Sequence, residues 1–156
     1  MTRLIPFVAA MTIAGSAAAQ DIYVGGSADY LLPHDGDTQV VGSVIGGMGF
    51  DTGLFGLGVG AEAEYGMHIA GENDYDTARV RGYLSYDWGH YSLRAGGGIT
   101  EYYFDDANYG GYHALLGAER ALTDNLSVRG EFIRDFVDDA FVAGITATRI
   151  GVVFDF

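Results

Sequence analysis

The sequence predicts an all-β protein, an eight-stranded antiparallel up-and-down transmembrane β-barrel. Three observations lead to this fold class. Eight segments alternate apolar and polar residues with a period of two, which is the period of a β-strand and not of a helix. The last of these segments ends the chain on an aromatic residue, Phe156. After residue 19 no apolar run is long enough for a spanning helix, so any membrane span must consist of strands.

Residues 1–19 have the features of a secretory signal peptide. Arg3 supplies the positive charge, Leu4–Ile13 the apolar segment, and Ala17–Ala19 the small residues of a cleavage site. About ten apolar residues are too few to cross ~30 Å of hydrocarbon as a helix. We therefore expect residues 20–156 to form the mature protein as one barrel domain.

Four predicted strands occupy the first half of this domain: Ile22–Leu31, Gln39–Phe50, Leu54–Ile69 and Thr77–Trp88. The third gives the clearest signal, because its residues from 55 to 69 alternate without a break. Apolar side chains fall on one face, while glycines and two glutamates fall on the other. The first strand alternates in the same way, the second does so more weakly, and the fourth sets apolar residues against Arg79 and Arg81.

Four more predicted strands complete the chain: Tyr91–Phe104, Tyr112–Leu122, Asn125–Phe136 and the terminal segment Val142–Phe156. The fifth strand alternates apolar residues with Arg94 and glycines, and Glu101 is an exception on its apolar face. A tilted membrane strand needs ~9–11 residues plus an extension beyond the bilayer, which these lengths provide. An even number of strands returns both termini to the same side of the barrel.

The connections between the predicted strands are of two kinds. Three are tight turns, as expected on the periplasmic side of a membrane barrel: Asp51–Gly53, Gly89–His90 and Thr123–Asp124. Four are longer: Leu32–Thr38, Ala70–Asp76, Asp105–Gly111 and Val137–Phe141. The longer connections carry nine acidic residues and no Arg, so we expect a strongly anionic rim at their end of the barrel.

The polar face of the strands carries charges of both signs. Away from the strand ends, five acids and five arginines share the phase assigned to the lumen: Asp29, Glu62, Glu64, Glu119, Glu131, Arg79, Arg81, Arg94, Arg129 and Arg149. Simple hairpin registers predict three pairs: Glu64 with Arg81, Glu119 with Arg129, and Glu131 with Arg149. An unpaired ion in so narrow a lumen costs several kcal/mol, so we expect these charges to pair and to plug the barrel. Three further acids have the same phase but lie at strand ends, where we expect contact with water: Asp87, Asp135 and Asp155.

Alternation alone does not decide which face lies inside, because a soluble barrel would invert the pattern. The aromatic residues on the apolar face favour the membrane, since they form two belts of the kind found at membrane interfaces. One belt lies near the tight turns: Tyr86, Trp88, Tyr91, Phe154 and Phe156. The other lies near the longer connections: Tyr30, Tyr65, Tyr103, Tyr112 and Phe136.

The last strand keeps its alternation up to the carboxyl terminus. Counting back from Phe156 in steps of two gives Phe154, Val152 and Ile150, all apolar. This pattern resembles the C-terminal sorting signal of bacterial outer-membrane barrels, which the barrel-assembly machinery reads. We therefore expect the cell outer membrane of a Gram-negative envelope as the compartment and the assembly machinery as a partner.

A second resemblance lies in the segment Gly117–Phe132, which reads GAERALTDNLSVRGEF. It is similar to a hairpin of small OmpA-like and Opa-like barrels, of the type Gly-x-Glu-aromatic-x-Leu-Thr-x-Asn-Leu-Ser-hydrophobic-Arg-x-Glu-aromatic. Arg120 stands where an aromatic is common. The resemblance implies an eight-stranded outer-membrane barrel without the C-terminal peptidoglycan-binding domain of full-length OmpA proteins. Members serve as structural proteins, adhesins, serum-resistance factors or narrow pores, so the function stays open.

Composition and motifs give little support to other chemistry. The net charge of −13 argues against a nucleic-acid partner, and the absence of cysteine excludes disulfides and thiolate chemistry. Some eight-stranded outer-membrane barrels modify lipid A, and the deacylases among them carry His-x-Ser on one strand. Here Ala114 and Leu115 follow His113. The glycine-rich strands precede no helix, which a phosphate-binding loop requires. We predict no enzyme activity and no cofactor.

Glu72, Asp74 and Asp76 present alternate carboxylates that could coordinate Ca²⁺ or Mg²⁺ with waters. The full EF-hand loop pattern is absent, since Thr77 rather than Gly follows Asp76. The alternative is a solvated anionic rim without bound metal.

The sequence thus predicts a monomeric outer-membrane barrel with a structural or surface-interaction role, as an adhesin or in envelope integrity. Its expected partners are outer-membrane lipid and lipopolysaccharide. Two alternatives stay open. A narrow ion-conducting pore requires the Glu/Arg cluster in the lumen to open, and a lipid A-modifying enzyme requires a catalytic Ser–His pair facing the lipid.

Overall fold

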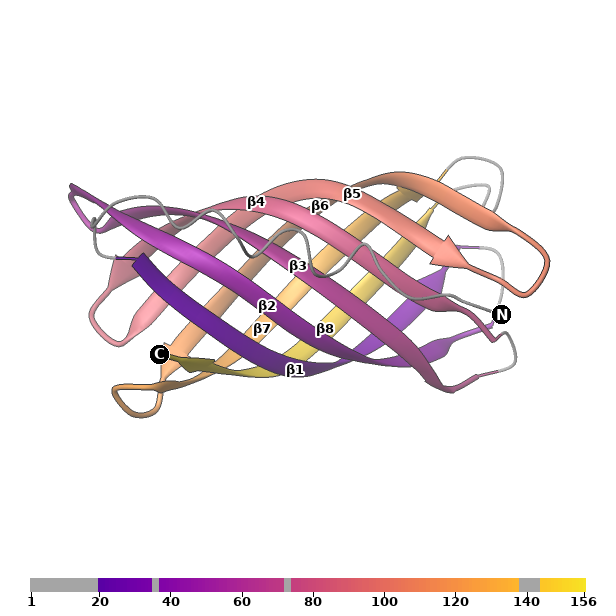
Figure 1. Ribbon diagram of the computed structural model, residues 1–156, viewed down its shortest axis with the longest axis horizontal. Coiled ribbons are helices and arrows are strands. Elements are labelled where there is room, and N and C mark those ends of the chain that lie inside the picture. Colours follow the sequence, from indigo (N-terminus) through magenta and orange to yellow (C-terminus); the bar gives the residue numbers. More distant parts are fainter. Residues whose placement is uncertain (1–19, 35–36, 72–73, 138–143) are drawn as a thin grey trace.

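The computed structural model describes residues 20–34, 37–71, 74–137 and 144–156. These residues form a closed antiparallel barrel of eight strands in chain order, in which β1 also pairs with β8 (Figure 1). The predicted fold class is confirmed. In this part of the chain no helix is long and apolar enough to span a membrane. The predicted signal peptide, residues 1–19, lies outside the described residues.

The strands are β1 (Gln20–Pro33), β2 (Gln39–Leu54), β3 (Leu57–Ala70), β4 (Asp76–Trp88), β5 (Tyr91–Tyr103), β6 (Asn108–Ala121), β7 (Leu126–Val137) and β8 (Ile145–Asp155). They run obliquely along the barrel (Figure 1). The β2–β3, β4–β5 and β6–β7 turns lie at one end together with the C-terminus, and we call this the turn end. Strands β1, β3, β5 and β7 end at the opposite end of the barrel, which we call the loop end.

The β2–β3 turn differs from the prediction. The residues predicted to form it, Asp51–Gly53, belong to β2, and the turn consists of Phe55 and Gly56. The pairing of the two strands shifts between Asp51 and Leu54, because two extra residues on β2 form a bulge there. Phe55 therefore lies in the turn and not on the strand face to which its alternation assigned it.

The β5–β6 connection is shorter than predicted. The sequence placed a long connection over Asp105–Gly111, but β6 already begins at Asn108, which pairs with Tyr103. The backbone amide of Phe104 donates a hydrogen bond of 2.9 Å to the carbonyl oxygen of Ala107 and closes a short turn. The polar and glycine residues of this segment indicated a loop, but pairing with β5 makes them strand.

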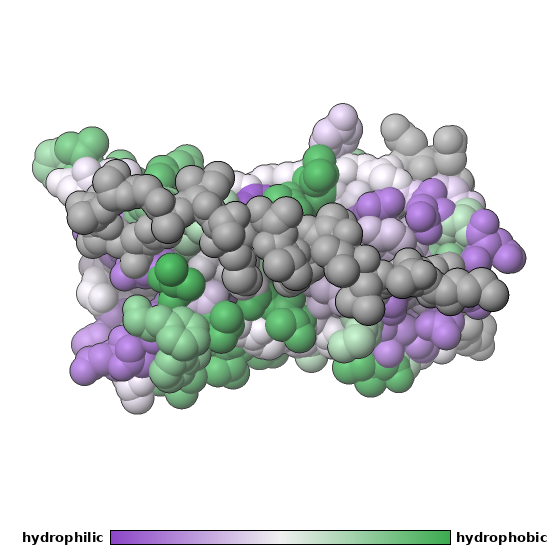
Figure 2. Space-filling view, in the orientation of Figure 1, coloured by the Kyte–Doolittle hydropathy of each residue, from purple (hydrophilic) through white to green (hydrophobic). Residues whose placement is uncertain are grey.

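The two faces of the barrel wall have opposite character. Apolar side chains point outward, among them Leu84 and Leu116, which are 62% and 66% exposed. Charged side chains point inward, where Glu62 and Arg81 are each 2% exposed. Hydrophobic side chains lie over the barrel wall, and hydrophilic ones gather mainly at its two ends (Figure 2). A barrel with an apolar exterior and an ionic interior is a transmembrane barrel of the outer-membrane type.

The interior holds two apolar clusters besides the charges. The larger lies toward the loop end: Leu31, Val41, Tyr75, Tyr102, Leu115, Ile133, Val137, Ile145 and Ala147, with Phe104 and Tyr109 packed against it. The smaller lies toward the turn end: Tyr23, Ile45, Tyr83 and Val153. The charged residues fill the space between and around these clusters.

Candidate functional site: the barrel interior

The structure places all ten charged residues that the alternation assigned to the lumen on the inner face of the barrel. Nine of them are at most 3% exposed, and the side chain of Glu119, near the turn end, is 19% exposed. They come from every strand except β2, because inward positions recur at each second residue of a strand. Together they form one continuous ion-pair network.

Arg149 on β8 and Asp29 on β1 join the first and last strands. Arg149 donates from Nε to Oδ1 of Asp29 at 2.7 Å and from Nη2 to Oδ2 at 2.5 Å. The same guanidinium donates from Nη1 to Oε2 of Glu64 at 2.6 Å and to Oε2 of Glu131 at 3.2 Å. One arginine therefore links strands β1, β3, β7 and β8.

Arg79 on β4 spans the lumen to Asp135 on β7. Its Nη2 donates to Oδ2 of Asp135 at 2.8 Å, and its Nη1 donates to Oε1 of Glu64 at 2.6 Å. The hydroxyl of Tyr102 donates to the same Asp135 oxygen at 2.8 Å. The expectation that water reaches Asp135 was wrong, since this carboxylate is 0% exposed. Tyr102 and Arg79 enclose it beneath the loop-end cluster.

Glu62 on β3 is the centre of the turn-end half of the network. Its carboxylate accepts a hydrogen bond from Arg81, one of 2.6 Å from Nη1 of Arg129 and one of 2.7 Å from the Tyr23 hydroxyl. Arg94 also pairs with it, at 3.4 Å, while its guanidinium carbon lies 3.9 Å from the centroid of the Tyr83 ring. Three cations thus surround a single buried carboxylate.

The strand registers place two of the three predicted Glu–Arg pairs directly opposite each other. These are Glu119 with Arg129 and Glu131 with Arg149. Glu64 instead faces Arg79, and Arg81 faces Glu62. The difference arises because β3 is longer than its pairing with β4. That pairing ends at Gly66, and the rest of β3, up to Ala70, pairs only with β2. Arg81 still reaches Glu64 diagonally, with Nη1 3.1 Å from Oε2.

An aromatic layer at the loop end was missed by the sequence analysis. Tyr75 lies 5.4 Å from Tyr102 and 5.0 Å from Phe104, measured between ring centroids, and Tyr109 packs against Phe104 at 5.5 Å. Tyr75 stands between β3 and β4, and burial raises the pKa of its hydroxyl. These rings cover the ion pairs below them. The available signal was Tyr102, an aromatic on the polar phase of its strand.

The barrel interior has a small opening at the turn end. A chamber of about 140 Å³ lies there, with Tyr23, Tyr83, Arg94, Arg129 and Glu119 among its lining residues. The carboxylates of four further residues surround it: Asp21, Asp51, Asp87 and Asp155. The chamber extends into the barrel from this end as far as Arg94 and Arg129.

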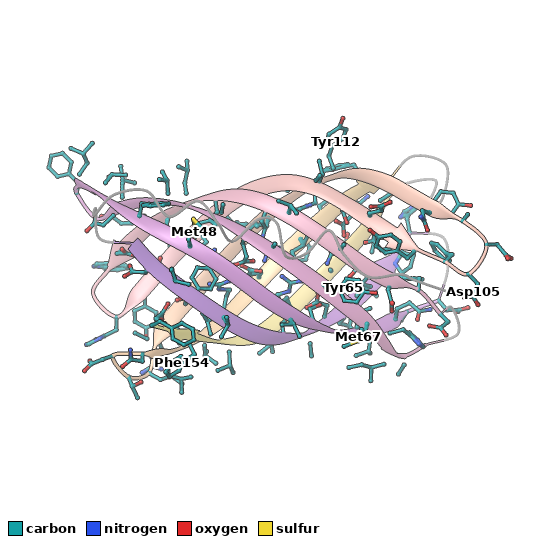
Figure 3. The ribbon with its side chains drawn as sticks, viewed as in Figure 1. Met48, Tyr65, Met67, Asp105, Tyr112 and Phe154 are labelled. Atoms are coloured by element: carbon teal, nitrogen blue, oxygen red, sulfur yellow. The ribbon has the colours of Figure 1, made fainter. Side chains whose placement is uncertain are left out.

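The structure describes only part of the predicted cation site. Glu72 lies outside the described residues. Asp74 lies 3.4 Å from Nδ1 of His68, and Asp76 accepts a hydrogen bond of 2.7 Å from the Tyr65 hydroxyl. Within the described ranges, no group of three or more His, Cys, Asp or Glu residues is arranged to hold a metal ion. Asp105, another acid of the rim, lies at the loop end (Figure 3).

The residues of the predicted sorting signal face outward on β8. Ile150, Val152 and Phe154 are 69%, 46% and 45% exposed, and Phe156 is 75% exposed. The rings of Phe154 and Phe156 meet edge to face with centroids 5.3 Å apart. Tyr112, of the aromatic belt at the loop end, projects away from the barrel wall (Figure 3).

No protein-family model and no curated protein matches the sequence. Solved structures do match the fold. The Neisserial surface protein A structure has a TM-score of 0.60 at 13% identity, over 91% of this chain and 100% of that one. The N-terminal β-barrel domain of Pseudomonas aeruginosa OprF has a TM-score of 0.59 at 12% identity, over 86% and 97%. The attachment invasion locus protein Ail of Yersinia pestis has a TM-score of 0.58 at 12% identity, over 90% and 100%.

At this level of identity the likeness shows the fold alone. It agrees with the resemblance that the Gly117–Phe132 hairpin and the terminal strand indicated. The apolar exterior, the ionic interior and the closed topology agree with it as well. The chain has the fold of the small eight-stranded outer-membrane β-barrels.

Proposed function

We propose that this protein serves the outer membrane as a closed, stable barrel that acts through its outer wall and rims, in envelope integrity or surface interaction. One observation carries the proposal. The lumen is filled by a continuous ion-pair network and covered at the loop end by the Tyr75–Tyr102 aromatic layer. An eight-stranded barrel is only wide enough to be filled by its own side chains, so a filled lumen leaves no path for solutes.

The proposed partners are membrane lipid, lipopolysaccharide and the barrel-assembly machinery, with the barrel as a monomer. Contact with lipid is supported by the apolar outer wall, and recognition by the assembly machinery by the exposed apolar residues of β8. Arg134 lies near the loop end of β7, where Nη1 donates to Oγ1 of Thr146 at 2.6 Å and the guanidinium carbon is 5.9 Å from the Phe136 ring centroid. A guanidinium among interfacial residues suits a lipopolysaccharide phosphate.

Surface adhesion, if the loop end mediates it, requires a neutral or cationic partner. Ail has been solved in complex with the heparin analogue sucrose octasulfate. A sulfated ligand of this kind needs basic groups, whereas this chain contains no lysine and its longer connections contain no Arg. We therefore do not extend polyanion binding to this protein.

Catalysis is not part of the proposal. His113, the histidine considered for lipid A chemistry, faces Asp135 across the β6–β7 pair and is 4% exposed. A side chain inside the barrel does not reach lipid on its outer wall. Expression of the protein should leave the acylation of lipid A unchanged by mass spectrometry, and a changed acyl pattern would overturn this part of the proposal.

Conductance separates the proposal from the pore alternative, which the turn-end chamber favours. The purified protein, verified as folded by its heat-dependent gel migration, should give no conductance steps in planar bilayers. A strain that lacks the protein should become more sensitive to detergents, and the wild-type protein should restore resistance. Regular single-channel steps would instead assign the protein a transport role.

A further inference from the structure

The β2–β3 hairpin carries an apolar tip at the turn end. Leu54, Phe55 and Leu57 are 59%, 92% and 45% exposed. The hairpin reaches the extreme end of the barrel, and hydrophobic side chains gather there (Figures 1 and 2). The β4–β5 turn consists of Gly89 and His90, and the β6–β7 turn of Leu122 to Asn125, in which Leu122 is 54% exposed. Phe55 is the most exposed of the large hydrophobic residues that the structure describes, and neither of the other two tight turns contains an aromatic residue.

Phe55 is held in a conformation that its residue type disfavours. Its φ is 53°, and among the described residues it is the only non-glycine residue with a positive φ. Gly56 beside it has a φ of 76°. Two-residue turns with positive φ at both positions favour Asn-Gly or Asp-Gly, and a bulky residue there is an outlier. Turn geometry alone therefore does not account for a phenylalanine.

Hydrogen bonds fix the tip in place. A carboxylate oxygen of Asp51 accepts from the amide of Gly53 at 2.7 Å, and the hydroxyl of Thr52 donates to the carbonyl of Leu57 at 2.6 Å. The amide of Asp87 on β4 donates to the carbonyl of Gly56 at 2.8 Å. The bulge held by these bonds pairs Leu54 with Leu57 and leaves Phe55 in the turn. The apolar tip is built into the hairpin and supported by the neighbouring strand.

The tip is continuous with the lipid-facing surface. Leu57 pairs with Tyr86 on β4, and Tyr86 pairs with Leu93 on β5, all with outward side chains. Trp88, at the end of β4, is 75% exposed and belongs with Tyr86 to the aromatic belt near the tight turns. Aromatic side chains at such positions lie at the boundary between headgroups and acyl chains.

We propose that the tip, residues 54–57, is a membrane anchor that inserts the Phe55 ring into the periplasmic leaflet of the outer membrane. The occupant of this surface is lipid, because the surface extends the established lipid-facing band. The anchor fixes the depth of the barrel on the side of β2 and β3, and the other two tight turns have no aromatic residue to match it.

Tryptophan fluorescence tests the anchor directly, because Trp88 is the single tryptophan of the chain. In a Trp88→Phe background, Phe55→Trp places the probe at the tip and Asp124→Trp places a matched probe in the β6–β7 turn. Each variant is reconstituted into phosphatidylcholine vesicles with plain or brominated acyl chains. The tip probe should emit at short wavelength and lose most of its intensity in brominated vesicles, whereas the β6–β7 probe should emit as in water and lose little.

Two results would overturn the anchor. A tip probe that emits as in water and is quenched by acrylamide lies outside the lipid, and the tip is then a contact for a periplasmic protein. Equal bromine quenching of the two probes would make the tip no different from its neighbours. Leu54→Trp in the same background gives an independent probe if Phe55→Trp does not show the heat-dependent gel migration of a folded barrel.

Discussion

Arg149 and Asp29 face each other across the seam where β8 meets β1, joined by hydrogen bonds of 2.7 and 2.5 Å in a fork arrangement. Both side chains are fully buried. A planar guanidinium matches a carboxylate in this geometry better than a lysine does. The chain, which contains no lysine, uses arginine for every basic contact in its lumen.

Asp29→Ala should destabilise the barrel strongly. Breaking a buried ion pair costs ~3–5 kcal/mol. Arg149 would lose its forked contact with Asp29 and keep only its contacts with Glu64 and Glu131. The free energy of unfolding by urea in detergent micelles measures this loss. Glu119→Ala is the control, because the Glu119 side chain is 19% exposed and its partner Arg129 keeps the 2.6 Å contact with Glu62. Equal losses for both variants would contradict a desolvated seam.

Leu116→Arg should lower the stability of the barrel in a bilayer by ~2–4 kcal/mol, because Leu116 is exposed near the middle of β6. Leu122→Arg, at the turn end, should cost only ~0–1 kcal/mol, since an interfacial arginine reaches water. Unfolding titrations in vesicles compare the two. A soluble barrel would tolerate both substitutions alike, so the difference between them reports the membrane.

Tyr102→Phe should cost ~1–3 kcal/mol, because the hydroxyl donates to the buried Asp135 carboxylate at 2.8 Å. Tyr103→Phe removes the neighbouring hydroxyl, which donates to the exposed Glu101 at 2.7 Å, and should change the unfolding free energy by less than ~0.5 kcal/mol. Chemical unfolding followed by tryptophan fluorescence measures both. Similar effects would mean that the aromatic layer does not shield Asp135 from water.

Gly56→Ala should destabilise the β2–β3 hairpin more than Gly53→Ala. Both glycines have positive φ, at 76° and 69°, so each substitution incurs strain of ~1 kcal/mol. A Cβ at Gly56 would also lie 2.8 Å from the carbonyl oxygen of Asp87, whereas one at Gly53 meets nothing within 4 Å. Urea unfolding should rank the variants in this order, and a reversed order would contradict the docking of the tip on β4.

The sequence predicted which face of each strand lies inside because alternation maps directly onto the two sides of a barrel wall. The inward positions of Glu62, Glu64 and Arg81 were predicted from the alternation alone. Their ion pairing was predicted from the narrowness of the lumen. The phase of the alternation does not show which residues form the turn of a hairpin. In the β2–β3 connection the alternation runs through the turn without a break, so Phe55 was assigned to a strand and Asp51–Gly53 to the turn.

Contacts across the lumen could not be predicted from neighbouring strands. Arg79 and Asp135 are separated by 56 residues and belong to strands that are not paired with each other. Only closure of the barrel brings them together. Tyr75 and Tyr102 meet for a different reason: Tyr75 directly precedes β4, and Thr77 of β4 pairs with Tyr102 of β5. The alternation does not extend into the connection that holds Tyr75.

The position of Arg149 has a consequence for biogenesis. Asp29 and Glu64 are made early, whereas the guanidinium that binds both arrives on the last strand. Until β8 is in place, two carboxylates inside the incomplete sheet lack this counter-charge, and hydrocarbon disfavours them. Placement of the final strand therefore completes the charge pairing of Asp29 and Glu64, which penalises a half-inserted sheet.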